Sequence, residues 1–315
     1  MSKAAVLLMG PTGAGKSDLA LELVDRLPLE IVSVDSALIY RGMDIGTAKP
    51  DAKTRARVPH HLIDIIDPAL SYSAGEFLRD ALREMNDIWA RGRQPLLVGG
   101  TMMYFHALTR GIAELPTGNV AIRASIEAQA ASSGWQSLHD ELARVDPTAA
   151  RRIHVNDPQR IQRALEVYRI TGVPITTLQL GSRSQLEGIE LFEYALAPTV
   201  RADLHANIER RFANMMQHGF LDEVAALRAR GDLTPAHPAM RCVGYRQLWR
   251  HLDGECSLEE AVRRGVIATR QLAKRQWTWL RRRPVAHWVD PAHPNAAQSV
   301  IFALSASNIN SASTS

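Results

Sequence analysis

The stretch Gly10-Pro11-Thr12-Gly13-Ala14-Gly15-Lys16-Ser17 decides the fold of this chain. It matches Gly-x4-Gly-Lys-Ser, a loop whose backbone N–H groups hold phosphate when a strand precedes it and a helix follows. Both neighbours are present, because residues 4–9 are a buried apolar run and residues 18–24 carry a helical apolar stripe. Lys16 supplies a charge, and Ser17 supplies a hydroxyl that can hold Mg²⁺. We predict a phosphate or diphosphate site here, and by itself such a loop indicates ATP or GTP.

The composition places the chain among globular proteins. Its 315 residues have room for a large core and a substantial insertion, and 46% hydrophobic with 22% charged residues is ordinary for a soluble protein. Apolar runs stay below the roughly 18 residues that span a bilayer, and the N-terminal run is too short for a secretory signal. We therefore expect a cytoplasmic protein without membrane contact. Cys242 and Cys256 have no Cys/His spacing around them and are expected to be plain thiols.

Short apolar strands alternate with amphipathic helices, which predicts an α/β fold with a parallel sheet flanked by helices. One strand, residues 31–34, ends at Asp35, and another, within residues 95–101, delivers Gly100 and Thr101. Ligands bind outside the carboxyl ends of parallel strands, so these residues should lie beside the phosphate loop. Asp35 could be a Mg²⁺ ligand, a general base or a structural helix cap. Thr101 is a candidate to hydrogen bond a leaving-group oxygen.

The next segments give local predictions. Residues 37–50 indicate a shaped loop near the site, and residues 58–68 predict a strand between turns. His60 and His61 would point to opposite sides of that strand, which favours a structural hydrogen bond over a metal site. Ser73 and Glu76 match a capping box that opens a helix ending near residue 91.

The sequence predicts that a helical insertion interrupts the core domain. Strand signals fade after residue 116, and the helical patterns that follow predict an inserted helical domain over 116–189, with the core formed by 1–115 and 190–290. Within the insertion, Glu166 and its neighbours Arg163 and Arg169 are spaced as helical surface pairs. Residues 291–315 are small and polar, so we expect a poorly ordered tail.

Charge is distributed unevenly. The net charge is +4, but residues 263–283 contain eight basic and no acidic residues: Arg263, Arg264, Arg270, Lys274, Arg275, Arg281, Arg282 and Arg283. A solvated helix face would normally interleave acids, so this run favours contact with a nucleic acid. The turn at residues 241–246 adds two guanidiniums and an aromatic ring, which suit phosphates and stacked bases.

Several stretches together resemble one family, the tRNA dimethylallyltransferases, also called isopentenyl-diphosphate:tRNA transferases. They are residues 10–17, 35–50, 60–64, 97–101, 156–160, 242–246 and 269–276, and the resemblance covers about residues 4–283. It implies a P-loop NTPase-like parallel sheet with an inserted all-helical domain. It also implies transfer of the dimethylallyl group of dimethylallyl diphosphate to N6 of the adenine 3′ to the anticodon. The expected cofactor is Mg²⁺ on Ser17, the partner is the tRNA anticodon stem-loop, and the enzyme is a monomer.

The resemblance also implies residue roles. Asp35 accepts the proton of the attacking amine, Thr101 hydrogen bonds near the reacting oxygen, and Arg211 clamps the diphosphate held by residues 10–17. The target adenine would leave its stack to reach this site. The implied tRNA contacts are Asp35, Ser36, Ala37, Leu38, Thr101, Arg123, Gln159, Arg160, Ile161, Gln162, Arg163, Arg241, Cys242, Val243, Gly244, Tyr245, Arg246, Lys274 and Arg275.

Two other functions are compatible with the loop. A P-loop small-molecule kinase would use the phosphate loop and Asp35 equally well, and a non-catalytic RNA-binding NTPase switch would use the loop and the basic segment. The kinase leaves the basic run after residue 263 unexplained.

Overall fold

The computed structural model describes residues 3–181, 183–283 and 286–307. The chain divides into two compact units, one formed by Met1–Phe105 with Glu187–Ser315 and the other by His106–Leu186. The sequence predicted an insertion over residues 116–189. In the structure the helical unit begins at His106, within the helix α4 (Met102–Arg110) and ten residues before the predicted start.

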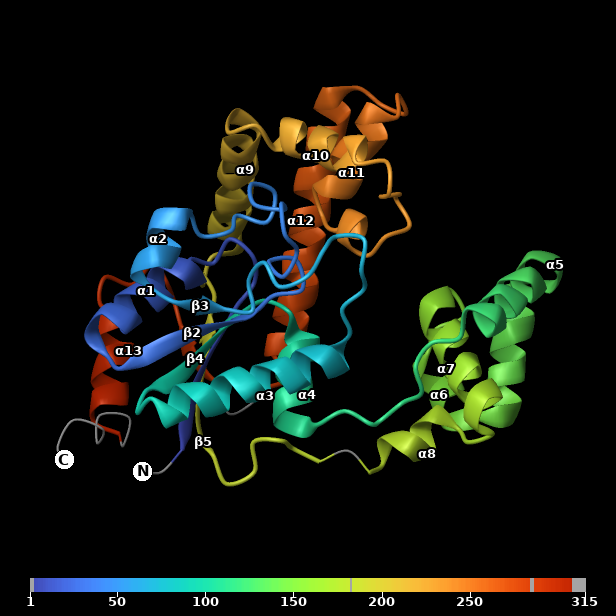
Figure 1. The fold of residues 1–315 in the computed structure, drawn as a ribbon, viewed down its shortest axis with the longest axis horizontal. Coiled ribbons are helices and arrows are strands. Elements are labelled where there is room, and N and C mark those ends of the chain that lie inside the picture. The colour runs from blue at the N-terminus through green and yellow to red at the C-terminus, as the bar shows by residue number, and fades with distance from the viewer. Residues whose placement is uncertain (1–2, 182, 284–285, 308–315) are drawn as a thin grey trace. The chain divides into compact units, whose positions relative to one another are not determined.

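A parallel sheet organises the first unit (Figure 1). Its strand order is β3-β2-β4-β1-β5-β6, and every neighbouring pair is parallel. The strands are β1 (Ala4–Met9), β2 (Leu29–Val34), β3 (His60–His61), β4 (Gln94–Gly99), β5 (Glu190–Leu196) and β6 (His287–Val289). All six residues of β1 are fully buried, as expected for a central parallel strand covered on both faces. The predicted α/β, P-loop-like parallel sheet is confirmed.

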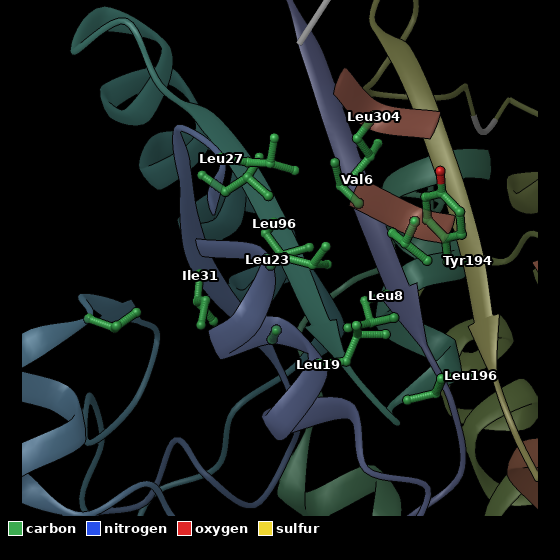
Figure 2. Packing of buried hydrophobic residues seen from close by; sticks show 14 of the residues in the cluster. Val6, Leu8, Leu19, Leu23, Leu27, Ile31, Leu96, Tyr194, Leu196 and Leu304 are labelled. Atoms are coloured by element: carbon green, nitrogen blue, oxygen red, sulfur yellow. The ribbon is translucent and has the colours of Figure 1, made fainter. Parts of the chain in front are cut away.

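One face of the sheet is covered by α1 (Lys16–Arg26) and α13 (Ala296–Ser305). Val6 and Leu8 of β1 point to this face and pack with Leu19 and Leu23 of α1 (Figure 2). Leu304 of α13 is fully buried in the same cluster. The expectation of a disordered tail is therefore wrong for residues 296–305, because an apolar stripe of this helix completes the core. Residues 308–315 lie outside the described residues.

The strand predicted over residues 58–68 is also largely wrong, since only His60–His61 pair with the sheet, next to β2. Leu62 and Asp64 have positive φ angles of 61° and 57°, which turn the chain away from the sheet. His61 has a structural role: its two ring nitrogens lie 2.9 Å and 3.0 Å from carboxylate oxygens of Glu30 and Glu84. Among the described residues, no group of three or more His, Cys, Asp or Glu side chains could hold a metal ion.

Helices form the rest of the first unit. The Ser73–Glu76 capping box is confirmed at the start of α3 (Ala74–Ala90). The shorter α2 spans Ala52–Arg57. Beyond β5, four helices and one 3-10 turn pack with Ile39, Tyr40 and Met43 of the long loop after β2. These elements are α9 (Arg201–Gln217), α10 (Phe220–Ala229), η1 (Ala239–Arg241), α11 (Tyr245–Leu252) and α12 (Leu258–Leu280).

The second unit contains helices around a small apolar core. They are α5 (Val120–Val145), α6 (Pro147–Arg152), α7 (Pro158–Thr171) and α8 (Ile175–Gln179). Gly134, with φ 77° and ψ 161°, breaks α5 into two segments. They match two separate helical patterns in the sequence, at residues 120–131 and 135–145. No helix among the described residues is long and apolar enough to cross a membrane.

Candidate active site

The phosphate loop follows β1 and opens α1, as predicted. Gly13 and Gly15 have φ angles of 82° and 81°, a left-handed conformation that favours glycine. A side chain on Gly10 would place its Cβ 2.4 Å from the carbonyl oxygen of Leu196, so the loop and β5 require glycine there. The free N–H groups at the start of α1 consequently face the space where an anion can bind.

Lys16 brings a positive charge to this loop. Its Nζ donates a hydrogen bond to the carbonyl oxygen of Pro11, at 2.8 Å. Burial lowers the pKa of Lys16 to about 8, while the carboxylate of Asp35 raises it and the guanidinium of Arg211 lowers it. An anion in the loop would compensate the charge that burial disfavours.

Asp35 and Thr101 lie at the carboxyl ends of the neighbouring strands β2 and β4, where Val34 is in register with Gly99. Asp35 accepts a hydrogen bond through Oδ1 from the N–H of Ala37, at 2.8 Å. Thr101 Oγ1 accepts one from the N–H of Ser36, at 3.0 Å. Asp35 Oδ2 has no hydrogen bond to any described residue. The predicted juxtaposition of Asp35 and Thr101 at one sheet edge is present.

Helix α9 lies across from the phosphate loop and contributes Arg211 and Asn207 to the site. Arg211 Nη2 donates to the carbonyl oxygen of Thr47 at 3.4 Å, and Asn207 Nδ2 donates to that of Gly13 at 3.4 Å. Burial holds the pKa of Arg211 below its ordinary value, although the carboxylate of Asp35 partly offsets this effect. Arg211 therefore lies close enough to both Asp35 and Lys16 to interact electrostatically with each.

A cavity of about 840 Å³ separates the loop from α9. Its lining residues come from the phosphate loop and the start of α1, from α9, from the segments after β2 and β5, and from the segment before α13: Gly13, Ala14, Gly15, Lys16, Ser17, Asp18, Ala48, Pro198, Asp203, Asn207, Arg210, Arg211, Ala213, Asn214, Gln217, Pro291 and Ala292. The sequence analysis identified Arg211 here but missed Asn207, Arg210 and Asn214. Their signal was a polar stripe at helical spacing. Pro291 carried no such signal.

Mg²⁺ fits the oxygen donor that this cavity offers. Ser17 is exposed at the beginning of α1 and lines the cavity. Mg²⁺ usually keeps several water ligands and binds one or two protein oxygens together with substrate phosphates, so it needs no cage of carboxylates. The Ser17 hydroxyl is the side-chain group that would hold it beside a diphosphate in this loop.

The turn at residues 241–246 lies close to Asp35, but its aromatic ring is not available for stacking on a base. Tyr245 is fully buried against Phe220 and donates a hydrogen bond to Glu223, at 2.5 Å. The interpretation of this ring as a base platform is therefore wrong. Burial raises the pKa of the Cys242 thiol to about 12, and the nearby charge of Asp35 adds to this shift.

Arg241 and Arg246 flank that turn and are exposed. The remaining members of the predicted contact, Val243 and Gly244, lie between them, and Gly244 adopts a φ of 92°. The two guanidiniums thus remain accessible to phosphate groups.

The basic run at residues 263–283, on α12 and directly after it, forms more ion pairs than its sequence suggests. Glu260 pairs with Arg263 and Arg264, Glu209 of α9 pairs with Arg270, and Glu193 of β5 pairs with Arg283. The four basic side chains of the run without an ion pair to a described residue are Lys274, Arg275, Arg281 and Arg282. Acids outside the run therefore pair with half of it. Glu260 is close in the sequence, whereas the pairing with Glu209 and Glu193 depends on the tertiary structure.

The helical unit carries the other predicted contacts, and two of its predictions need correction. Glu166 is fully buried, so the interpretation of Glu166 and Arg163 as a surface pair is wrong. Its carboxylate accepts from Arg123 Nε at 2.7 Å, from Arg163 Nη1 at 2.6 Å and from the N–H of Asn119 at 2.8 Å. Burial raises the pKa of Glu166, but these hydrogen bonds hold it below its ordinary value. Arg169 pairs instead with Glu141.

The start of α7 divides into exposed and buried positions. Gln159 and Arg160 are exposed, and Gln162 donates to Glu127 at 2.9 Å. Ile161 is fully buried in the helical core, so the structure contradicts an RNA contact by its side chain. A residue implied by a motif can therefore serve packing rather than binding.

A model of the IPP transferase family matches residues 38–283. The full-length tRNA isopentenylpyrophosphate transferase of Bacillus halodurans is 35% identical with a TM-score of 0.71, over 99% of this chain and 98% of that one. The tRNA delta(2)-isopentenylpyrophosphate transferase of Staphylococcus epidermidis is 30% identical with a TM-score of 0.67, over 96% and 98%. A eukaryotic dimethylallyltransferase acting on tRNA is 25% identical with a TM-score of 0.80, over 95% and 78%.

Proposed function

Because this chain belongs to the IPP transferase family, we propose that it transfers a dimethylallyl group from dimethylallyl diphosphate to N6 of the adenine 3′ to the anticodon of tRNA. It is a tRNA prenyltransferase, and the comparisons give no support to the kinase alternative. The observation that carries the proposal is the phosphate loop whose Lys16 interacts with the carboxylate of Asp35, at the end of a neighbouring strand. A kinase site would not need the exposed arginines of residues 241–246.

The reaction replaces one bond by another. The bond between C1 of the dimethylallyl group and the diphosphate oxygen breaks, and a bond between C1 and N6 forms, so the diphosphate leaves with the electron pair. An amine on a base is a weak nucleophile, so the site must stabilise the leaving group and align the amine. The N6 proton passes to Asp35 Oδ2.

Positive groups then stabilise the leaving diphosphate. Lys16, Arg211 and residues of the loop line the cavity, where they would surround the diphosphate. The Thr101 hydroxyl would hydrogen bond the bridging oxygen. Mg²⁺ held by Ser17 would supply further charge neutralisation when it is bound. On this proposal the enzyme acts as a cytoplasmic monomer.

We assign tRNA binding to exposed basic and polar side chains near the active site and on the helical unit. Arg241, Arg246, Lys274 and Arg275 can contact phosphates, which position the RNA without reading its sequence. Gln159 and Arg160 offer the same chemistry on the helical unit. The adenine must unstack to reach Asp35, so the substrate is expected to be a flexible anticodon loop rather than a duplex.

The direct test incubates the protein with unmodified tRNA and either dimethylallyl diphosphate or ATP, and measures nucleoside masses after digestion. Prenyl transfer is expected with the first donor only. Asp35→Asn should lower the transfer rate by about 10²–10⁴-fold, the range for a general base, with unchanged tRNA affinity. Asp87→Asn, at an exposed site on α3, is the matched control and should behave as wild type.

Two results would contradict this proposal. One is ATP consumption with no mass change in the tRNA when dimethylallyl diphosphate is present. The other is normal turnover by Asp35→Asn once its tRNA is bound, which would remove Asp35 as the base.

A further inference from the structure

Gln276 is a buried polar side chain on α12 that links two loops of the site. Its Oε1 accepts a hydrogen bond from the N–H of Thr12 in the phosphate loop, at 2.9 Å. Its Nε2 donates to the carbonyl oxygen of Gly100, beside Thr101, at 2.9 Å. These partners follow β1 and β4, which are adjacent in the sheet. One amide therefore joins the donor loop to the loop that presents the Thr101 hydroxyl.

The orientation of this amide is fixed by its partners. The Thr12 N–H can only donate and the Gly100 carbonyl can only accept, so a flipped amide would lose both hydrogen bonds. The fit is also tight, because a Cβ on Gly100 would lie 2.4 Å from Gln276 Nε2. Glycine at position 100 thus permits the close approach that the bridge needs.

The bridge is connected to both sides of the proposed reaction. Thr101 continues from Gly100 and holds Ser36, the residue after Asp35, through its Oγ1. Thr12 belongs to the loop whose Pro11 carbonyl accepts from Lys16. Displacement of the amide would therefore reach the diphosphate cradle through one hydrogen bond and the Thr101 hydroxyl through the other.

We propose that Gln276 is a positioning residue, which sets the distance between the diphosphate loop and Thr101. This inference rests on the proposed function. The adjacent residues Lys274 and Arg275 are exposed bases assigned to tRNA, so the same helix carries an RNA contact and the bridge. A residue that served only to anchor α12 would affect stability, whereas a positioning residue also affects donor binding and turnover separately.

Two substitutions separate the hydrogen bonds. Gln276→Glu keeps an acceptor for the Thr12 N–H but cannot donate to the Gly100 carbonyl. Gln276→Met has a similar length and makes neither hydrogen bond. The control is Gln271→Met, an exposed glutamine on the same helix.

The assays measure prenyl transfer at varied dimethylallyl diphosphate, binding of inorganic pyrophosphate by calorimetry, tRNA affinity and thermal unfolding. Gln276→Glu should lower kcat about tenfold and change the KM for the donor by less than about threefold, because only the Thr101 side is released. Gln276→Met should also weaken pyrophosphate binding by about tenfold. Both variants should bind tRNA as wild type does, and Gln271→Met should match wild type throughout.

The outcomes separate this inference from the proposed function. If wild type transfers no prenyl group, the proposed function fails, and pyrophosphate binding by Gln276→Met still tests the bridge. If wild type is active and Gln276→Glu keeps its kcat, the positioning role is overturned. Activity that falls in both variants only in proportion to the fraction unfolded would also overturn it, since an anchor for α12 explains that pattern.

Discussion

Replacing Lys16 by methionine is expected to stabilise the free protein while it weakens diphosphate binding. A pKa of about 8 instead of 10.5 means that the fold disfavours the charged ammonium by about 3 kcal/mol. Methionine also loses the hydrogen bond to the carbonyl oxygen of Pro11, which contributes about 1 kcal/mol. The free energy of unfolding at pH 7 should therefore rise by about 2 kcal/mol.

The pH dependence gives this prediction its sign. Below pH 8 the lysine is charged in both the folded and unfolded states, so the cost is fully present. Between pH 8 and 10.5 the unfolded chain binds more protons than the folded one, so wild-type stability rises with pH. The advantage of Lys16→Met should consequently be largest at pH 7 and shrink as the pH rises through this window.

Urea unfolding followed by tryptophan fluorescence at pH 7 and pH 9.5 measures the difference, with exposed Lys53→Met as the matched control. Calorimetry with pyrophosphate at pH 7 should show binding weakened by about 10–100-fold for Lys16→Met, the range for a lost charged hydrogen bond. A variant that is less stable than wild type at pH 7, or whose advantage grows with pH, would refute the reasoning.

Three further predictions concern other parts of the chain. Glu166→Gln should destabilise the helical unit by about 1–3 kcal/mol. This loss is smaller than that of a fully buried ion pair, because Arg123 and Arg163 are partly exposed. Unchanged hydrogen exchange in α5 and α7 would contradict this prediction. Leu304→Ala should cost about 2–5 kcal/mol in urea unfolding, whereas Phe302→Ala, 77% exposed on the same helix, should cost little; equal effects would mean that α13 is not packed as described. Replacing Lys274 and Arg275 by alanine should make the fall of log tRNA affinity with log salt concentration less steep, by about 1–2 in slope. An unchanged slope would exclude both residues as phosphate contacts.

The parts of the site that lie at strand ends were predictable from sequence. Gly13, Gly15 and Lys16 form a local motif, because the left-handed backbone of the loop is encoded by glycine positions a few residues apart. Asp35 and Thr101 were placed together because parallel strands present their carboxyl ends at one edge, which is a property of the fold class rather than of side-chain packing.

Predictions failed where a partner was distant in the chain. The basic run at residues 263–283 was assigned whole to nucleic acid, but two of its arginines pair with acids far away in the chain, Arg270 with Glu209 and Arg283 with Glu193. Tyr245 was assigned to stacking, but Glu223 and Phe220 bury it. Local spacing shows which side chains share a helix face, and it does not show what packs against that face.

The sequence by itself determined the phosphate loop, the parallel sheet and the resemblance to tRNA dimethylallyltransferases, since each depends on short-range patterns and their order. The tertiary structure decided that α9 walls the cavity, that α13 completes the core, and that Gln276 joins Thr12 to Gly100. These features depend on segments far apart in the chain. Their contacts arise when apolar burial brings whole elements together, and the pattern within each segment does not specify its partner.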